Sequence, residues 1–188
     1  MLLEMSAAIV LAAGASQRLG RPKQLVAIDS ETLLQRALRI AHDAGCAPVV
    51  AVLGAHHETI LAHSDLHQAV TVINRAWQEG IASSIRLGLK ALPRTAKGAV
   101  LLTCDQPAIS AAHLRLLMAS SNITASAYAG RRGVPAYFPA SSFSELMKLR
   151  GDRGARSLLH TAAAIHLPGG ELDIDTAADL AQAKLLFR

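Results

Sequence analysis

The stretch that decides the fold reads Leu11-Ala12-Ala13-Gly14-Ala15-Ser16-Gln17-Arg18-Leu19-Gly20-Arg21-Pro22-Lys23. It follows an apolar run, Ala7–Leu11, of the kind that forms a buried strand. A strand that opens into glycines and cations is typical of a loop that wraps phosphates. Glycine allows the backbone to approach closely, amide groups point inward, and arginine and lysine supply charge.

Two familiar phosphate loops are excluded by spacing. A P-loop ends in Gly-Lys-Ser/Thr, whereas Lys23 lies three residues beyond Gly20 and Gln24 follows it. A dinucleotide fingerprint needs G-x-G-x-x-G, and Gly14 has no glycine two residues on. The remaining pattern is L-A-A-G-x-S-x-R-x-G-x-x-K.

Strand and helix patterns alternate along almost the whole chain, which predicts an α/β fold with a mainly parallel sheet and helices on both faces. We expect ligands at the carboxyl edge of such a sheet, where the loop after the first strand lies. Residues 1–188 are expected to form a single domain. The expected strands are 7–12, 48–53, 69–73, 99–103, 124–128, 134–138 and 165–167, and the expected helices are 31–45, 57–63, 80–92, 110–120, 142–149, 154–163 and one from Thr176.

Composition narrows the class of protein. The net charge of +5 comes from scattered cations without interleaved aromatic residues, which argues against nucleic-acid binding. Apolar runs fall far short of the ~20 residues that span a bilayer, and Glu4 with no basic region argues against a signal peptide. Cys46 and Cys104 lack any metal-ligand spacing. We expect a cytoplasmic protein that binds no membrane and no nucleic acid.

Asp105 is the first acidic candidate for chemistry. It ends the apolar run 99–103 and precedes Pro107, so it lies at the ligand edge of the predicted sheet. An aspartate here can simply form a turn. Beside a phosphate loop, however, its carboxylate suits Mg²⁺, which prefers one or two carboxylates with water and phosphate oxygens.

Asp175 is the second acidic candidate, in the run Asp173-Ile174-Asp175-Thr176. The alternative is structural, because Asp175 or Thr176 can cap the final helix while Asp179 favours its positive end. Spacing alone leaves both interpretations open.

Several stretches together resemble one family, the MobA-like NTP transferases, and within it the molybdenum cofactor cytidylyltransferase branch. The resemblance implies a nucleotide-diphospho-sugar transferase-like fold, a Rossmann-like three-layer α/β/α sandwich. The matching stretches are the opening loop, Asn74-x-x-Trp77-x-x-Gly80-x-x-Ser83-Ser84, Asp105-Gln106-Pro107, Gly133-Val134-Pro135-x-x-Phe138, Gly151-Asp152-x-Gly154-Ala155-Arg156 and Asp173-Ile174-Asp175-Thr176.

The resemblance implies that a terminal phosphate of molybdopterin attacks the α-phosphorus of CTP and releases pyrophosphate. Arg18, Lys23 and Asp105 would be catalytic, and Asp105 and Asp175 would hold Mg²⁺ as Lewis acid and template. The remaining site residues are assigned in the same way. Leu11, Ala12, Ala13, Gly14, Arg18, Lys23, Gly54, Ser83, Ser84 and Asp105 would contact the nucleotide, and Pro135, Asp152 and Arg156 the acceptor.

The base preference follows from Ala13. The family resemblance favours Ala12-Ala13-Gly14, rather than a double glycine, as the mark of a pyrimidine user. The methyl group of Ala13 would narrow the space beside the base and so penalise a purine.

Alternatives stay open at several positions. Arg156 can hold an acceptor phosphate or pair with Asp152 four residues earlier. Trp77 can stack on a ligand or pack at a helix start, and Cys104 fits best as a small strand residue. The acceptor can instead be a sugar or alditol phosphate. The chain can also act as a chaperone that delivers molybdenum cofactor to a molybdoenzyme.

Overall fold

The computed structural model describes residues 5–187. Glu4, on which the expectation of no signal peptide rests, lies outside them. The described chain forms a seven-stranded sheet and a separate two-stranded hairpin, and none of its helices is long and apolar enough to cross a bilayer. In spatial order the sheet contains β5 (Val70–Ile73), β4 (Val49–Leu53), β1 (Ala7–Ala12), β6 (Gly98–Thr103), β8 (Arg131–Pro139), β7 (Thr124–Tyr128) and β9 (Ala163–His166).

The sheet is mostly parallel, as the alternating pattern predicts. β5, β4, β1 and β6 pair in parallel, β8 runs antiparallel to both of its neighbours, and β9 pairs in parallel with β7. The chain passes from β1 to β4 in one direction and returns past β1 to β6. The strand order therefore reverses between β1 and β6, where open α/β sheets place their ligands.

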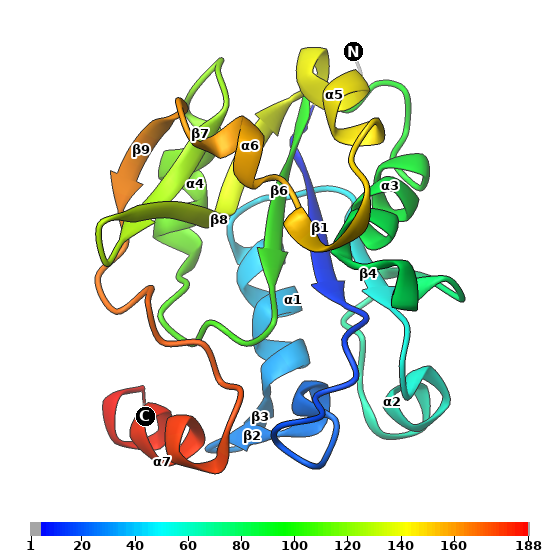
Figure 1. The fold of residues 1–188 in the computed structure, drawn as a ribbon, viewed down its shortest axis with the longest axis vertical. Coiled ribbons are helices and arrows are strands. Elements are labelled where there is room, and N and C mark those ends of the chain that lie inside the picture. The colour runs from blue at the N-terminus through cyan, green and yellow to red at the C-terminus, as the bar shows by residue number, and fades with distance from the viewer. Residues whose placement is uncertain (1–4, 188) are drawn as a thin grey trace.

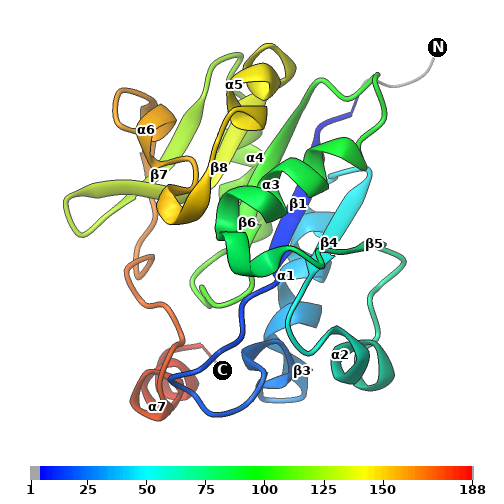
Figure 2. The same cartoon turned by 45° about the vertical axis from the view of Figure 1, so that its right-hand side comes forward.

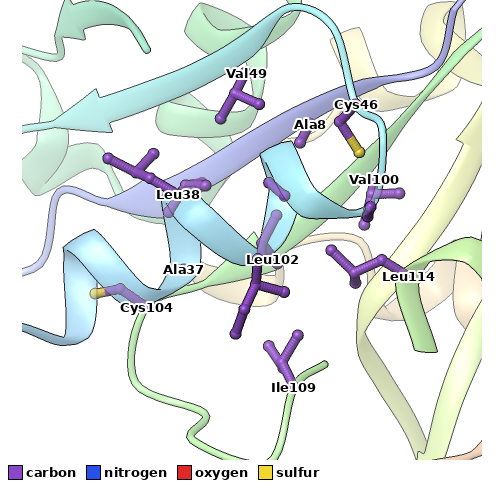
Figure 3. Packing of buried hydrophobic residues seen from close by; sticks show 14 of the residues in the cluster. Ala8, Ala37, Leu38, Cys46, Val49, Val100, Leu102, Cys104, Ile109 and Leu114 are labelled. Carbon is purple, nitrogen blue, oxygen red and sulfur yellow. The ribbon is translucent and has the colours of Figure 1, made fainter. Parts of the chain in front are cut away.

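Helices cover both faces of the sheet (Figure 1, Figure 2). On one face α1 and α4 pack over even-numbered positions of β1, and Figure 3 shows this apolar layer with Leu38, Ala8, Val100 and Leu114 gathered in it. On the other face α3, α5 and α6 pack over odd-numbered positions such as Ile9. The helices are α1 (Leu33–Asp43), α2 (His57–His63), α3 (Ile81–Lys90), α4 (Ala111–Met118), α5 (Phe143–Met147), α6 (Arg156–Leu159) and α7 (Ala177–Leu186).

Helix starts follow local sequence signals. Thr32 caps α1 in a capping box with Gln35, and Ser110 caps α4 by accepting a hydrogen bond from the His113 amide. The helix expected over 154–163 is wrong in extent. Only one turn forms, Arg156–Leu159, because Ala163 and Ala164 pair with β7 instead.

The last helix packs against the segment that follows the glycine loop. α7 packs on the small hairpin of β2 (Ala27–Ile28) and β3 (Glu31–Thr32), which lies just after the glycine loop (Figure 1). Val26, Ile28 and Ile174 are buried together there, apart from the two layers beside the large sheet. This contact brings residues 173–175 toward the carboxyl edge of β1 and β6.

Candidate active site

The loop after β1 folds back on itself. Ser16 has a positive φ of 53°, and its carbonyl accepts hydrogen bonds from the amides of Leu19 and Gly20 at 3.1 and 3.2 Å. The Ser16 hydroxyl accepts a further bond from the Lys23 amide at 3.0 Å. The turn therefore carries Arg18 at its tip and returns Lys23 toward the end of β1.

Gln24 holds this loop from below. Its side chain is buried, and its Nε2 donates to the carbonyls of Ala12 and Gly14 at 2.7 and 3.1 Å. These bonds connect the strand end to the short 3-10 helix Lys23–Leu25. No sequence signal singled out Gln24, because a glutamine that follows a lysine carries no distinctive pattern.

The two acidic candidates lie side by side. The Ile174 amide donates to the Asp105 carbonyl at 2.9 Å, which joins segment 173–175 to the loop after β6. Thr176 caps α7 in a capping box with Asp179. Of the two caps that the sequence left open, the structure therefore shows Thr176, and the Asp175 carboxylate does not cap the helix.

Lys23 lies between these carboxylates. Its Nζ is 2.8 Å from Asp105 Oδ2 and 2.5 Å from Asp175 Oδ1, and Arg18 pairs with the other oxygen of Asp175. The Lys23 side chain is only 13% exposed. Burial opposes its charge, but the attraction of both carboxylates outweighs this effect and holds the pKa of Lys23 above its usual value.

The donor set fits a divalent cation of the magnesium type. Asp105 and Asp175 present oxygen atoms to one point, the position of Lys23 Nζ, and Mg²⁺ takes one or two carboxylates with water and phosphate oxygens. Within residues 5–187 no group of three or more histidine, cysteine, aspartate or glutamate side chains forms a metal cage. A metal here would need ligands from a bound anion or water.

A cavity of about 390 Å³, the β1–β6 cleft, opens beside Lys23. Of the residues expected to contact a nucleotide, it is lined by Leu11, Ala12, Ala13, Gly14, Lys23, Ser84 and Asp105. Arg18 lies outside it, in an open hollow with Ser16, Trp77 and Asp175. The rest of the wall of the β1–β6 cleft comes from Gln24, Trp77, Gln78, Gly80, Ile81, Thr103, Cys104 and Asp152.

Gly54 and Ser83 support the cleft without lining it. A Cβ at Gly54 would lie 2.7 Å from the Ala13 carbonyl oxygen and 2.8 Å from Trp77 Cβ, so glycine allows those residues to approach. The Ser83 hydroxyl donates to the Gly80 carbonyl at 2.8 Å. The Ala13 methyl lies against Gly54.

A second cavity of about 320 Å³, the arginine cavity, adjoins the first. Both cavities are lined by Ile81, Thr103, Asp105 and Asp152. Its other wall carries Arg131, Arg132, Arg153, Arg156, Tyr128 and Asp173.

Asp173 is the acidic residue of that wall. Burial, followed by repulsion from Asp105, raises the pKa of Asp173 to about 6 despite Arg131 at 4.0 Å. Four arginines and three aspartates line this cavity, so its cationic side chains outnumber the acidic ones by one.

The expected acceptor residues separate in the structure. Arg156 lines the arginine cavity, and Asp152 lies where the two cavities meet, with its Oδ1 accepting a 3.3 Å bond from the Ile81 amide. Among the described ion pairs none joins Asp152 to Arg156. Pro135 is buried and its carbonyl accepts a bond from Ser126 Oγ, while its neighbour Val134 reaches the cavity wall.

Sequence reasoning missed part of both walls. The run Gly130-Arg131-Arg132-Gly133 was expected to be only a turn, yet β8 begins at Arg131 and both arginines face the second cavity. Trp77, for which stacking on a ligand and packing at a helix start both stay open in the sequence, begins a short 3-10 helix and lines the cleft. Cys104, expected to be a small strand residue, is buried one position beyond the end of β6, and burial raises the pKa of its thiol to about 12.

The cleft beside a glycine loop, the paired carboxylates and the mostly parallel sheet agree with one family of known proteins. This chain belongs to the MobA-like NTP transferase family. The family's domain model matches residues 8–166. Asp175 lies beyond the matched region and reaches the site through the α7 segment.

Curated relatives carry different names. The chain is 33% identical to nicotine blue oxidoreductase of Paenarthrobacter nicotinovorans, over 80% of this chain and 79% of that protein. It is 31% identical to purine catabolism protein PucB of Bacillus subtilis, over 89% and 90%. A probable molybdenum cofactor guanylyltransferase of Opitutus terrae matches at 32%, over 56% of this chain and half of that protein.

Solved structures agree with the fold. Rv0371c of Mycobacterium tuberculosis superposes with a TM-score of 0.87 at 31% identity, over 98% of this chain and all of that one. A manganese complex of Rv0371c matches at 28% identity with a TM-score of 0.81, over 96% and 98%. The 2-C-methyl-D-erythritol 4-phosphate cytidylyltransferase of Thermus thermophilus shares the fold, with a TM-score of 0.69 at 18% identity, over 99% and 100%.

Proposed function

We propose that this family member transfers CMP from CTP to the terminal phosphate of molybdopterin, with Mg²⁺ at Asp105 and Asp175. The observation that carries the proposal is Lys23 Nζ, which lies within 2.8 Å of both carboxylates beside the glycine loop. A cation and two acids at one end of a cleft are what a metal-bound triphosphate requires. The manganese complex of Rv0371c supports a divalent metal in this family.

The reaction brings one anion to another. Two unit charges ~4 Å apart repel by about 4 kcal/mol at an effective dielectric near 20, so cations must neutralise both partners. In the proposal an oxygen of the acceptor phosphate forms a bond to the α-phosphorus, and the bond from the α-phosphorus to the bridging oxygen breaks to release pyrophosphate. Mg²⁺ would supply Lewis acidity to this step.

Residues of the chain would act as positioning and neutralising groups. Lys23 and Arg18 would turn from the carboxylates to the triphosphate and stabilise the leaving pyrophosphate. The acceptor would occupy the arginine cavity, where Arg156 and its neighbours bind its phosphate. Because Asp105 lines both cavities, donor and acceptor would meet at that carboxylate.

Pyrophosphate release tests the proposal. The purified chain is incubated with Mg²⁺, each of four NTPs, and molybdopterin or a panel of sugar and alditol phosphates. We expect release with CTP and molybdopterin, and much less with GTP. Equal release with GTP overturns the base assignment, and release only with a sugar or alditol phosphate overturns the acceptor assignment.

Two contrasting activities are decided by the same preparation. A chaperone for molybdenum cofactor would bind the pterin without Mg²⁺, so Asp105→Ala would leave its binding unchanged. The relative named an oxidoreductase suggests a redox activity as the contrast, and the absorbance of an added reduced nicotinamide would report its oxidation. The glycine loop lacks G-x-G-x-x-G and the Cys104 thiol is buried, so we expect no such oxidation.

A further inference from the structure

Asn74 organises the base of the β1–β6 cleft. It follows β5, is 4% exposed, and its Oδ1 accepts a 3.0 Å bond from the Ala76 amide. Because a backbone amide can only donate, this bond fixes which end of the Asn74 side chain is oxygen. Both protons of Nδ2 then point to α3, where they reach Ser83 Oγ at 2.7 Å and Ser84 Oγ at 2.9 Å.

The two serines use their own protons differently. The Ser83 hydroxyl donates within the protein, to the Gly80 carbonyl at 2.8 Å, with the Ala76 carbonyl at 3.1 Å. Ser84 Oγ accepts from Asn74, and within residues 5–187 no acceptor takes its proton. Ser84 is 3% exposed and lines the cleft, while Ser83 does not.

We propose that Asn74 is a positioning residue that makes Ser84 a hydrogen-bond donor to the nucleoside half of the bound NTP. With one lone pair of Ser84 Oγ engaged by Asn74, the hydroxyl proton turns away from Asn74. A donor at this point recognises a carbonyl oxygen or an unprotonated ring nitrogen. Lys23 lines the same cleft and fixes the phosphate end. The inference rests on the proposed nucleotide site and names a determinant of its base specificity.

The chain offers a matched set of variants. Asn74→Asp is nearly isosteric, but a carboxylate only accepts, so the Ser84 proton would turn back to it and a lone pair would face the ligand. Ser84→Ala removes the donor, and Ser84→Thr keeps it. Ser142→Ala is the control, because it removes the hydroxyl of another buried serine, which bonds the Pro139 carbonyl and does not line the cleft.

Calorimetric titration with CTP and with GTP, each with Mg²⁺, tests the inference on the full chain, and thermal unfolding is measured beside it. For the NTP that binds more tightly, we expect Ser84→Ala and Asn74→Asp each to weaken binding about tenfold. Ser84→Thr stays within about threefold and Ser142→Ala within about twofold of the parent, although Ser142→Ala lowers the unfolding temperature. The Asn74→Asp/Ser84→Ala double variant binds no more weakly than either single variant, because both changes act on one hydrogen bond.

Two results overturn the inference alone. Unchanged binding by Ser84→Ala excludes the donor role, and additive losses in the double variant exclude action of Asn74 through Ser84. If Asn74→Asp does not fold, Asn74→Ala in the same two backgrounds gives the same comparison. Failure of the parent protein to bind any NTP overturns the proposed function together with this inference, and so is distinct from the first two results.

Discussion

Lys23 shows how one residue can join two acidic segments that are far apart in the sequence. Its ammonium contacts Asp105 from the loop after β6 and Asp175 from the segment before α7. These carboxylates would otherwise repel each other at the end of a cleft with limited solvent access. The lysine therefore supplies the charge that a divalent cation would bring.

Lys23→Met tests this role. Loss of the shared cation removes the ion pair of Asp105 and leaves Asp175 paired with Arg18 alone, and we expect a loss of about 1–3 kcal/mol in unfolding free energy. Added Mg²⁺ should raise the unfolding temperature of the variant more than that of the parent, because the metal no longer competes with an ammonium. Thermal unfolding with and without Mg²⁺ measures both effects.

Lys90→Met, at an exposed position at the end of α3, is the matched control and should show neither effect. A Lys23→Met variant that is as stable as the parent and insensitive to Mg²⁺ would contradict the role. Adding Asp105→Asn to Lys23→Met should abolish the metal response.

Two glycines of the cleft wall, Gly80 and Gly14, differ in whether the structure leaves room for a side chain. Gly80 has a φ of +99°, and a Cβ there would lie 2.4 Å from Asp152 Oδ1 and 2.5 Å from the Gly151 carbonyl carbon. Gly80→Ala should therefore lower the unfolding free energy by about 2–4 kcal/mol. A Cβ at Gly14 meets nothing within 4 Å, so Gly14→Ala should unfold at the parent temperature. Denaturant titration of the two variants checks the contrast, and equal stabilities would refute it.

At the level of elements, a buried polar chain links α4 to the sheet beside the arginine cavity. Ser126 on β7 donates to the Pro135 carbonyl at 2.6 Å, so His113 Nε2, at 2.8 Å, must be the donor to Ser126 Oγ. Burial, with a smaller contribution from His166, lowers the pKa of His113 below its usual value of 6.5. The folded protein therefore favours the neutral ring.

This link predicts a dependence of stability on pH. A histidine with a lowered pKa in the folded state contributes stability above the unfolded pKa near 6.5, and that contribution is lost as the pH falls toward the folded pKa. Below pH 6.5 one such group can steepen the fall in unfolding free energy by at most about 1.4 kcal/mol per pH unit. His113→Gln keeps a donor for Ser126 and should flatten the curve. Denaturant titrations across this range would contradict the link if parent and variant fell in parallel.

Elements with strong local signals were predictable from the sequence, and those fixed by tertiary pairing were not. β1 is an apolar run before glycines, and α1 begins at a capping threonine, so both follow from the residues alone. The alanines at 162–164 suit a helix by propensity, yet β9 forms there because β7 offers an open edge. In the site, the glycine loop and Asp105 are predictable from the sequence, because each follows an apolar strand pattern. The position of Arg131 in the wall of the arginine cavity and the hydrogen bonds of Gln24 depend on tertiary contacts, which residue spacing does not encode.

At the scale of the whole molecule, the site residues are held by hydrophobic clusters of unequal size. β1 and β6 lie between two large apolar layers, whereas Asp175 is placed by α7 and the β2–β3 hairpin through a smaller buried cluster. Small clusters open locally at a lower free energy than the main core. Segment 173–175 is therefore expected to detach before the sheet unfolds.

Activity and unfolding should separate on heating. We expect pyrophosphate release to fall several degrees below the midpoint followed by circular dichroism, and Leu180→Ala, which weakens the α7 contact, to widen the gap. Leu114→Ala in the main core is the comparison and should lower both temperatures together. Coincident curves for the parent and for Leu180→Ala would show that α7 and the sheet melt as one unit.

The docking of α7 has a further consequence for how such an enzyme can be tuned. Asp175, one of the two acids, is placed by α7 and the smaller buried cluster. Substitutions on the outer face of α7 or on the β2–β3 hairpin can therefore set the working temperature range, while every group that touches substrate stays the same. Moderate heating would then inactivate the protein before the sheet unfolds, and cooling would restore its activity.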